Sequence, residues 1–553
     1  MFVRKLFFFL IATAGALGLP AVGPAAQRHL AVTPPMGWND WAHYQCNFTA
    51  QTILANARAL VRTGLAGRGY DTVTIDDCWM LKSRDRHGHL QPDPRRFPRG
   101  MRPVAAAIHA LGLRFGIYED AGSLTCGGFA GSGSLVAGGK PHFLTDARLF
   151  AAWGVDYLKL DGCNVSPATG GPGNAAYRAA YRAESLALER VGRPIVFSES
   201  APAYFQGTAQ WYDVLAWVRR YGQLWREGTD IATYDRKQPS RSRFGSVMWN
   251  YDYNLQLGRF QEPGNWNDAD FIIGGDRGLT FAETRSQLAL WSMMSAPLIL
   301  SSNLDRLPLS MIGVLGNRAV LSVDQDPWGI MATLVRRSPT VDVLMKPLEQ
   351  GGYAVAVLNR SAAPVHIELL PRELGFAGHC RMDVHALWTG ARHAAIDALA
   401  AEIEAHDTDI WKIRPAEDCG APARIGVITR ILPDVPESRE DAEDYTRCVA
   451  APGSVQPCTG TAAQTWQVLP DGVLRSDREC LTQSGSRAVL ATCRAGDTQH
   501  WRYTLRGNLV NEASHRCLTG PASGGLAVET CGHNLASQIW TLPNGMTKPR
   551  GAI

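Results

Sequence analysis

Short apolar runs alternate with longer amphipathic segments over the first part of the chain. The runs have the length and composition of buried strands, and they lie at 36–38, 72–77, 114–118, 157–161, 194–198, 224–231, 265–274 and 297–300. Between them the apolar residues recur with helical spacing, as in Ile53, Ala57 and Leu60. Eight strands that alternate with helices predict a (β/α)8 barrel, which we expect at 27–328.

After the barrel, the spacing of apolar residues changes from helical to strand-like. Short segments rich in β-forming residues lie at 341–345, 352–358, 366–370 and 410–413, a pattern typical of an antiparallel β-sandwich. We therefore expect a β-sandwich at 329–417, and we expect no catalysis there. Residues 418–440 are rich in proline and charge, which predicts a linker.

A motif of two cysteines followed by Gln-x-Trp occurs three times near the carboxyl terminus. The glutamines are Gln464, Gln499 and Gln538, which are 35 and 39 residues apart. This repeat predicts a β-trefoil at 441–546 and resembles ricin-type lectins and family 13 carbohydrate-binding modules. Such lectins usually bind sugar through an aspartate shortly after the first cysteine, where this chain has Thr482 and Thr519. Glycan binding by the trefoil and a purely structural trefoil both stay open.

The amino terminus has the pattern of a secretory signal peptide, which we assign to residues 1–26. Arg4 and Lys5 precede a mostly apolar run at 6–17, and small residues follow it. The run is shorter than the roughly 20 residues that span a bilayer, so we expect no membrane span. Twelve cysteines in an exported chain indicate disulfides and an oxidising compartment, so we expect a secreted or periplasmic protein.

Charge and cysteine spacing argue against two classes of function. The formal net charge is only +4 over 553 residues, which gives no basic surface for nucleic acid. The spacing Cys-x-x-Cys does not occur in the chain, which argues against a zinc site. We expect neither a metal nor a cofactor.

Acidic and aromatic residues stand at the carboxyl ends of the predicted barrel strands. Asp161 is the most informative, because it ends an apolar strand where a buried, unpaired carboxylate would cost several kcal/mol. The residues at these ends include Trp38, Asp40, Asp76, Asp77, Tyr118, Asp120, Lys159, Asp161, Ser200, Arg226, Asp230, Trp266, Asp268 and Asp270. Glycoside hydrolysis needs two carboxyl groups, and sugar recognition uses further carboxylates and aromatic rings. Single aspartates in such places often cap helices, but six strand ends in a row favour a sugar site.

Five motifs, in order along residues 30 to 415, resemble glycoside hydrolase family 27, the α-galactosidases and α-N-acetylgalactosaminidases. They are TPPMGWN at 33–39, IDDCW at 75–79, GIY at 116–118, YLKLDGC at 157–163 and PGNWNDAD at 263–270. The resemblance implies a secreted, retaining exo-glycosidase that hydrolyses terminal α-D-galactosidic bonds by double displacement. A galactose-containing oligosaccharide or polysaccharide would be its partner.

The resemblance also implies a role for each site residue. Asp161 would be the nucleophile and Asp230 the general acid and base, with Arg226 four residues before it. Asp76 and Asp77 would hold O4 and O6 of the sugar, with Trp38 as a wall. Tyr118, Lys159 and Asp270 would complete the substrate site. Lys159, on the same strand face as Asp161, should also favour the ionised nucleophile.

The same resemblances imply how the cysteines pair. The barrel family implies Cys46–Cys78 and Cys126–Cys163, the second beside the nucleophile. The trefoil implies Cys448–Cys458, Cys480–Cys493 and Cys517–Cys531. Cys380 and Cys419 are left over and would form the sixth disulfide.

The loop after the fifth strand leaves the sugar open. Typical α-galactosidases carry a glutamate and a leucine where Ser200 and Ala203 stand, and small residues are the N-acetylgalactosaminidase pattern. Glu199 replaces the family cysteine of this loop, and its partner near Gly222 is missing too. A β-L-arabinopyranosidase and a dextran-cleaving enzyme are further alternatives within the family. The alternative outside enzymes is an inactive sugar-binding protein, against which the presence of both Asp161 and Asp230 argues.

Overall fold

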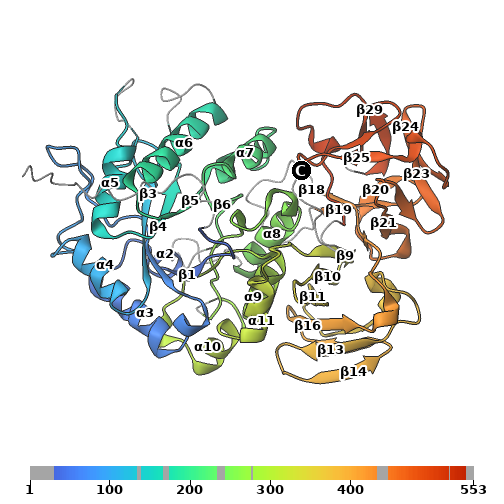
Figure 1. The fold of residues 1–553 in the computed structure, drawn as a ribbon, viewed down its shortest axis with the longest axis horizontal. Coiled ribbons are helices and arrows are strands. Elements are labelled where there is room, and N and C mark those ends of the chain that lie inside the picture. The colour runs from blue at the N-terminus through green and yellow to red at the C-terminus, as the bar shows by residue number, and fades with distance from the viewer. Residues whose placement is uncertain are drawn as a thin grey trace, which may run out of the picture.

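The computed structural model describes residues 30–133, 139–165, 173–232, 243–275, 278–431, 446–521 and 523–543. The expected signal peptide lies outside these residues. Figure 1 shows a barrel of strands and helices beside two β-rich bodies, one formed by residues 333–415 and the other by the carboxyl-terminal region. No helix among the described residues is long and apolar enough to cross a membrane.

The first body is a barrel of parallel strands, as the sequence predicts. Its sheet has the order β7-β6-β5-β4-β3-β2-β1-β8, and a further bridge between Ile272 and Leu300 links the segment after β7 to β8. The strands are β1 (Met36–Asn39), β2 (Thr72–Ile75), β3 (Arg114–Asp120), β4 (Tyr157–Asp161), β5 (Val196–Glu199), β6 (Leu224–Arg226), β7 (Trp266–Asp268) and β8 (Leu298–Leu300). Nearly all their side chains are buried, because helices cover the outside of the barrel.

Helices follow the strands and pack around them (Figure 1). They are α2 (Trp41–Tyr44), α3 (Ala50–Arg62), α4 (Met101–His109), α5 (Phe143–Trp153), α6 (Asn174–Val191), α7 (Trp211–Val218), α8 (Arg243–Asn254), α9 (Phe281–Met294), α10 (Leu309–Leu315) and α11 (Arg318–Asp324). Short 3-10 helices include η3 (Ala201–Phe205), between β5 and α7. Two helix starts are fixed by capping boxes, Thr49 with Thr52 and Thr280 with Glu283.

The second body consists of antiparallel sheets. Six strands pair in the order β14-β13-β16-β11-β10-β9, and β12 pairs with β15. The strands are β9 (Thr333–Arg337), β10 (Val341–Pro347), β11 (Tyr353–Asn359), β12 (Val365–Leu369), β13 (Met382–Ala386), β14 (Arg392–Ile396), β15 (Leu399–Ile403) and β16 (Thr408–Pro415). Alternate residues of these strands, such as Val343, Val355 and Ile367, form a core of their own.

The carboxyl-terminal body is built from three similar units. Its longer strands are β19 (Thr446–Ala450), β20 (Ser454–Pro457), β23 (Glu479–Ser484) and β24 (Arg487–Thr492); the short ones are β21 (Trp466–Val468), β22 (Leu474–Ser476), β25 (Trp501–Tyr503), β26 (Leu509–Asn511), β27 (Cys517–Thr519), β28 (Gly524–Gly525) and β29 (Ala527–Glu529). The Gln-x-Trp tryptophans repeat one contact, since Trp466, Trp501 and Trp540 each donate to a backbone carbonyl, at 2.7 to 3.0 Å. All three rings lie in one core.

Residues 425–431 of the expected linker at 418–440 pair with strands of the trefoil. Two strands fall within it, β17 (Ile425–Gly426) and β18 (Thr429–Ile431), and they pair with β21 and β19 of the trefoil. Cys419 at its start is bonded to Cys380 of the sandwich. These short strands gain their partners from residues far along the chain, so proline and charge content alone could not show them.

The twelve cysteines form six disulfides, and the pairs are those expected from the sequence. They are Cys46–Cys78, Cys126–Cys163, Cys380–Cys419, Cys448–Cys458, Cys480–Cys493 and Cys517–Cys531. Two disulfides lie in the barrel and three in the trefoil, and Cys380–Cys419 bonds the sandwich to the segment that follows it.

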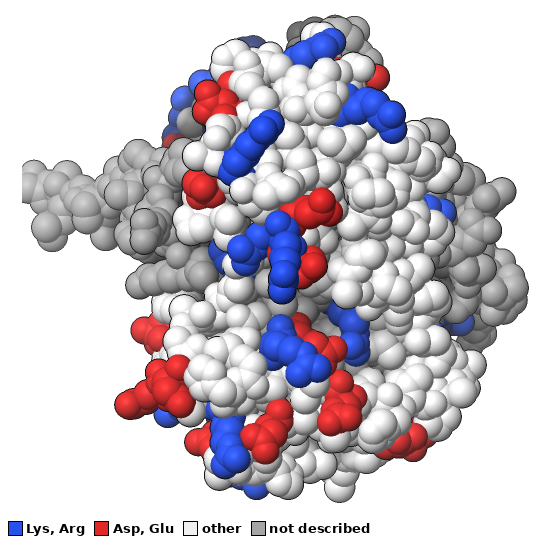
Figure 2. Space-filling model, turned by 90° about the vertical axis from the view of Figure 1, so that its right-hand side faces the viewer, with Lys and Arg blue, Asp and Glu red and all other residues white. Residues whose placement is uncertain are grey.

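Figure 2 shows one side of the molecule, with basic and acidic side chains interspersed and large areas that carry neither. On this face, over the atoms that the structure describes, there is no continuous basic surface of the kind that binds phosphates.

Candidate active site

The proposed nucleophile stands at the carboxyl end of a central barrel strand. Asp161 is the last residue of β4, and its carboxylate accepts hydrogen bonds from the hydroxyls of Tyr204 (2.5 Å) and Tyr118 (3.3 Å) and from the backbone N–H of Gly162 (2.9 Å). Burial and then the Asp161 carboxylate raise the pKa of both tyrosines, which keeps the phenols as donors. Asp161 is therefore held in one orientation by three donors.

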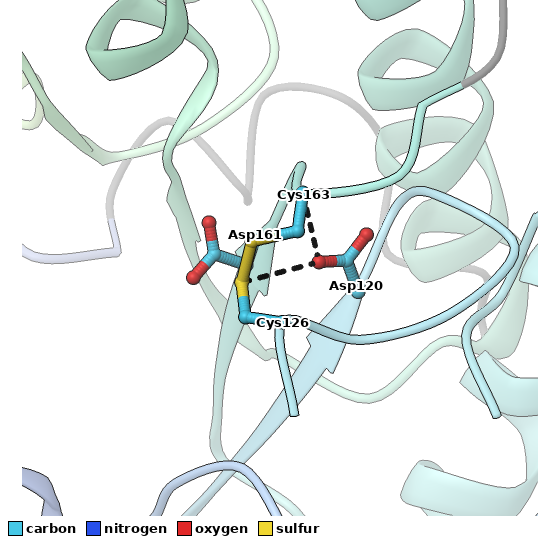
Figure 3. Close-up of side chains that lie close together, drawn as sticks. All are labelled: Asp120, Cys126, Asp161 and Cys163. Carbon is cyan, nitrogen blue, oxygen red and sulfur yellow. Dashed lines mark hydrogen bonds between the residues drawn. A yellow bond between two sulfur atoms is a disulfide. The ribbon is translucent and has the colours of Figure 1, made fainter. Parts of the chain in front are cut away.

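A second carboxyl group and a disulfide lie beside Asp161 (Figure 3). Asp120 ends β3 in register with Asp161, and its Oδ2 accepts from the backbone N–H of Cys163 at 3.0 Å. Burial and the neighbouring Asp161 raise the pKa of Asp120 to about 8, against the lowering effect of the backbone N–H groups of Gly122 and Cys163. The two carboxyls and the sulfurs of Cys126 and Cys163 lie within 4.8 Å of one another. Because the sulfurs are bonded to each other, they are not thiolate ligands for a metal.

The two aspartates after β2 are buried and held from several sides. The Oδ2 of Asp76 accepts from the Lys159 ammonium at 2.8 Å and from the side-chain amide of Asn39 at 2.7 Å. Asp77 accepts from the backbone N–H of Gly127 at 2.7 Å, and a Cβ on that glycine would lie 2.9 Å from the carboxylate. Burial is the main cause of a raised pKa at Asp77.

Lys159 lies at the centre of the acidic residues. Burial lowers the pKa of Lys159, but the carboxylates of Asp76 and Asp161 raise it more, so the ammonium stays charged. The Nζ atom is also 5.2 Å from the ring centroid of Tyr118 and 5.1 Å from that of Phe271. The Lys159 ammonium is therefore fixed by Asp76 and by two aromatic rings, on the strand that ends in Asp161.

Arg226 organises the other half of the site. Its buried guanidinium lies 2.9 Å from Asp270 and 3.1 Å from Asp230, and it donates to the carbonyls of Gly228 and Thr229 at 3.2 Å each. Burial opposes the charge, yet Asp270 and Asp230 raise the pKa of the guanidinium. The Arg226 side chain is buried, whereas the Asp230 side chain is 75% exposed. It can therefore meet a leaving group or a water molecule.

Asp270 mainly fixes residues 227–231, which contain Asp230 and which we call the Asp230 loop. Its Oδ2 accepts from the backbone N–H of Ile231 at 2.7 Å, and its Oδ1 accepts from that of Phe271 at 2.8 Å. The backbone of Asp270 has φ of 75°, a conformation that costs an ordinary residue energy and is found at functional sites. Burial raises the pKa of Asp270 to about 6, against the opposing effect of Arg226.

Trp38, Ser200 and Ala203, which the sequence analysis expects in the substrate site, differ in how far they are buried. Trp38 has no exposed surface, and its indole N–H donates to the carbonyl of Ser302 at 2.8 Å, so its ring is part of the packed core of the barrel. Ser200 is buried directly before η3, and Ala203 is half-buried within η3, where its N–H donates to the Ser200 carbonyl. Both belong to the same turn as Tyr204, which bonds Asp161.

Glu199 stands at the position where the resemblance described above would place a cysteine. It is fully buried at the end of β5, and a Cβ on Gly222 would lie 2.5 Å from its Oε1. The carboxyl therefore occupies space that only glycine at 222 leaves open. Burial raises the pKa of Glu199 well above its ordinary value, although the backbone of Gly222 lowers it.

This burial gives a testable pH dependence. Folded Glu199 keeps its proton above pH 4.5, where the unfolded chain releases it, so the folded state binds more protons and its stability falls as pH rises. The Glu199→Gln variant cannot titrate there. We expect its free energy of unfolding to decrease less between pH 5 and pH 8 than that of the wild type, measured by urea denaturation. Glu368→Gln, at an exposed position of β12, is the matched control and should keep the wild-type slope. Equal slopes for Glu199→Gln and wild type would contradict the buried, protonated carboxyl.

Two residues at the site were not assigned by sequence reasoning. Tyr204 lies within the loop quoted for Ser200 and Ala203, but a tyrosine in a loop carries no sign of which carboxylate it will meet. Asp120 was noticed only as one of many strand-end acids. Its position opposite Asp161 in the β3–β4 register was available once both strands were predicted.

The trefoil threonines are engaged inside their own repeats. The hydroxyl of Thr482 accepts from the Gln499 amide at 2.8 Å, and that of Thr519 accepts from the Gln538 amide at 2.9 Å. Both side chains are buried. The positions that carry a sugar-binding aspartate in ricin-type lectins are thus occupied by groups that fix the Gln-x-Trp core.

Comparison with protein families matches the three bodies separately. Residues 33–326 match the model of α-galactosidase A, 338–413 that of the α-galactosidase C-terminal β-sandwich domain, and 442–540 that of the ricin-type β-trefoil lectin domain. The matches therefore fall on the three bodies of the structure.

Individual relatives cover nearly the whole chain. A probable α-galactosidase A of Aspergillus clavatus is 38% identical over 94% of this chain and 95% of its own length, and α-galactosidase A of Aspergillus niger is 36% identical over 97% and 96%. Among solved structures, α-galactosidase I from Mortierella vinacea is 27% identical with a TM-score of 0.62, covering 70% of this chain and 98% of that one.

Proposed function

Since the chain belongs to the α-galactosidase family and is a glycoside hydrolase that acts on α-galactosides, we propose that it releases the terminal sugar by double displacement. Asp161 is the nucleophile and Asp230 is the general acid and then the base. The observation that carries this proposal is the contrast between the two carboxyls. Asp161 is fixed by three hydrogen-bond donors, whereas Asp230 contacts Arg226 and has a side chain that is 75% exposed.

In the first step, an oxygen of Asp161 forms a bond to the anomeric carbon while the glycosidic bond breaks. The proton of Asp230 goes to the departing oxygen, so the leaving group departs as an alcohol. In the second step, Asp230 takes a proton from water, and the water oxygen bonds to the anomeric carbon as the Asp161 ester breaks. Two inversions give overall retention of configuration.

The donors around Asp161 suit a leaving carboxylate in the second step. Tyr118, Tyr204 and the N–H of Gly162 hold the anion as it forms, without any need for reorganisation. Lys159 adds a fixed positive charge, which the Asp76 carboxylate orients. These groups lower the energy of the ionised nucleophile and leave its attacking direction defined.

Sugar recognition is assigned to the paired carboxyls after β2. Asp76 and Asp77 are fixed by Asn39, Lys159 and Gly127, so they can accept hydrogen bonds from two hydroxyl groups at little cost in side-chain entropy. We assign O4 and O6 of a galactose-like ring to this pair. The remaining oxygen contacts are assigned to Lys159 and Asp270.

A second candidate function is hydrolysis of α-N-acetylgalactosaminides. It is favoured by Ser200 and Ala203, two small side chains on the turn that also carries Tyr204. If they line the sugar 2-position, a 2-acetamido group fits there. Replacing them with the larger residues of typical α-galactosidases would fill that space.

The substrate is tested by hydrolysis of nitrophenyl α-galactoside, α-N-acetylgalactosaminide and β-L-arabinopyranoside under the same conditions. We expect the highest kcat/KM for the α-galactoside. Ser200→Glu combined with Ala203→Leu should leave that value within about tenfold and reduce any acetamido activity further, because only the second substrate needs the small side chains. A preference for the acetamido sugar would favour the second candidate. Hydrolysis of the arabinopyranoside above both would contradict the O6 assignment to Asp76 and Asp77.

We further propose that the enzyme is exported, as the amino-terminal pattern predicts. Six disulfides support this, because such bonds persist in oxidising compartments. A galactose-containing oligosaccharide or polysaccharide outside the cell is then the substrate. Cleavage of the precursor after about residue 26 can be checked by sequencing the amino terminus of the secreted protein.

A further inference from the structure

The trefoil is attached to the barrel by residues 505–506, which precede its third repeat, and by residues 533–534 within that repeat. On α7, the Asp213 carboxylate lies 2.8 Å from the guanidinium of Arg506 and 2.7 Å from Nε2 of His533. The side-chain amide of Asn534 donates to the carbonyl of Ala209, directly before α7, at 2.7 Å. Three trefoil side chains thus converge on one short segment of the barrel.

A second barrel residue holds the same part of the trefoil. The Arg259 guanidinium donates to the carbonyls of Leu505 (2.8 Å) and Arg506 (3.3 Å), and within the barrel to that of Gln256 (2.6 Å). It also lies over the Tyr212 ring, with its central carbon 5.7 Å from the centroid. The trefoil turn that presents Arg506 to Asp213 is therefore fixed from both sides.

The barrel segment that receives these contacts also reaches both proposed catalytic carboxyls. We call residues 204–213 the docking segment. At its start, the Tyr204 hydroxyl donates to Asp161. Next, the Gln206 side-chain oxygen accepts from the N–H (2.7 Å) and hydroxyl (2.9 Å) of Thr229, the residue before Asp230.

The later part of the docking segment supports the Asp230 loop again. The indole N–H of Trp211 donates to the carbonyl of Glu227 at 2.7 Å. A Cβ on Gly228 would lie 2.2 Å from the Gln206 oxygen, so the loop and the docking segment are in direct contact. The ten residues of the docking segment therefore contact the nucleophile, the Asp230 loop and the trefoil.

We propose that the trefoil surface formed by residues 505–506 and 533–534 is a positioning element of the active site and that Asp213 is its main contact point on the barrel. The trefoil holds the docking segment in place, and the segment sets the hydrogen bond to Asp161 and the position of the Asp230 loop. This role needs no sugar on the trefoil, in agreement with the buried threonines of its repeats. The inference rests on the proposed function, since it assigns Asp213 to the same reaction.

The experiment uses the full-length enzyme and whichever of the three nitrophenyl glycosides the wild type cleaves fastest. These substrates carry one sugar, so tethering by the trefoil cannot influence their rates. For Asp213→Asn we expect kcat to fall roughly 3- to 20-fold with KM within about twofold, because coupling through a chain of contacts has this size. Asn534→Ala removes one of the contacts from the trefoil side and should also lower kcat. Asp471→Asn is the control, since Asp471 pairs with His500 inside the trefoil and should leave kcat unchanged.

A double-mutant cycle with Tyr204→Phe separates positioning from general loss of structure. If Asp213 acts through the docking segment, its substitution should lower kcat by a smaller factor in the Tyr204→Phe background than in the wild type, because the route through Tyr204 is then already lost. The melting temperature of each variant is recorded beside its kcat. Wild-type kcat in both Asp213→Asn and Asn534→Ala, or effects that simply multiply with that of Tyr204→Phe, would overturn the inference while leaving the proposed function intact. A wild type that cleaves none of the glycosides would overturn the proposed function itself, and the inference with it.

Discussion

The Asp161→Asn enzyme is expected to lose at least about a thousandfold in kcat while keeping its fold. The amide has the shape of the carboxylate, and its oxygen can still accept from Tyr204 or from the N–H of Gly162. It carries no negative charge, however, so it cannot attack the anomeric carbon or leave as an anion. Steady-state kinetics on nitrophenyl α-galactoside, together with thermal unfolding, measures both properties.

Asp156→Asn is the matched control for this variant, because Asp156 lies at the opposite end of the same strand. Its carboxylate contacts Arg193 and His109 and accepts from the N–H of Phe115. We expect this variant to unfold at a lower temperature and to keep kcat within about twofold, since nothing at the carboxyl end of β4 changes. Activity of Asp161→Asn within tenfold of the wild type would show that the nucleophile is another group.

The Asp230→Asn enzyme is expected to discriminate sharply between leaving groups. For an oligosaccharide, whose alcohol needs a proton, kcat/KM should fall roughly 10²- to 10⁴-fold. For nitrophenyl α-galactoside the fall in kcat/KM should be much smaller, because nitrophenolate leaves without a proton. The second step still lacks its base, so the glycosyl-enzyme should accumulate and give a burst of nitrophenol equal to the enzyme concentration.

Glu227→Gln is the control for Asp230→Asn. Glu227 is fully buried three residues earlier, and burial raises the pKa of its carboxyl well above the ordinary value. Replacing this buried acid by an amide of the same shape should leave the ratio of the two kcat/KM values unchanged. Equal losses on both substrates in Asp230→Asn, without a burst, would contradict its role as the acid.

The local sequence predicted the strands that carry the site and the charged residues at their ends. Apolar runs of strand length predicted the barrel, and the ends of those runs identified Asp161 and Lys159, which β4 carries in the structure. This succeeded because a buried parallel strand is nearly all apolar, so a charged residue at its end is conspicuous. The three trefoil repeats followed similarly, from a motif that recurs at a regular spacing, whereas the disulfide pairs were implied by the resemblance to known families.

Contacts between distant segments could not be obtained in this way. Tyr204 meets Asp161 only because η3 folds back over the end of β4, and Glu199 is accommodated only because residue 222 is glycine. Within the expected linker, Thr429–Ile431 likewise becomes a strand only by pairing with β19. Each of these depends on which surfaces the barrel brings together.

The sequence by itself thus determined the order and type of the three bodies, the family and the strand ends where the carboxyl groups stand, because each is written in periodicity or in a short motif. Only the tertiary structure decided which hydroxyls hold Asp161, that Arg226 bridges Asp230 and Asp270, and that Asp213 receives the trefoil. Hydrogen bonds and ion pairs need atoms within a few ångströms, and the chain reaches such distances between remote residues only after its apolar surfaces have packed.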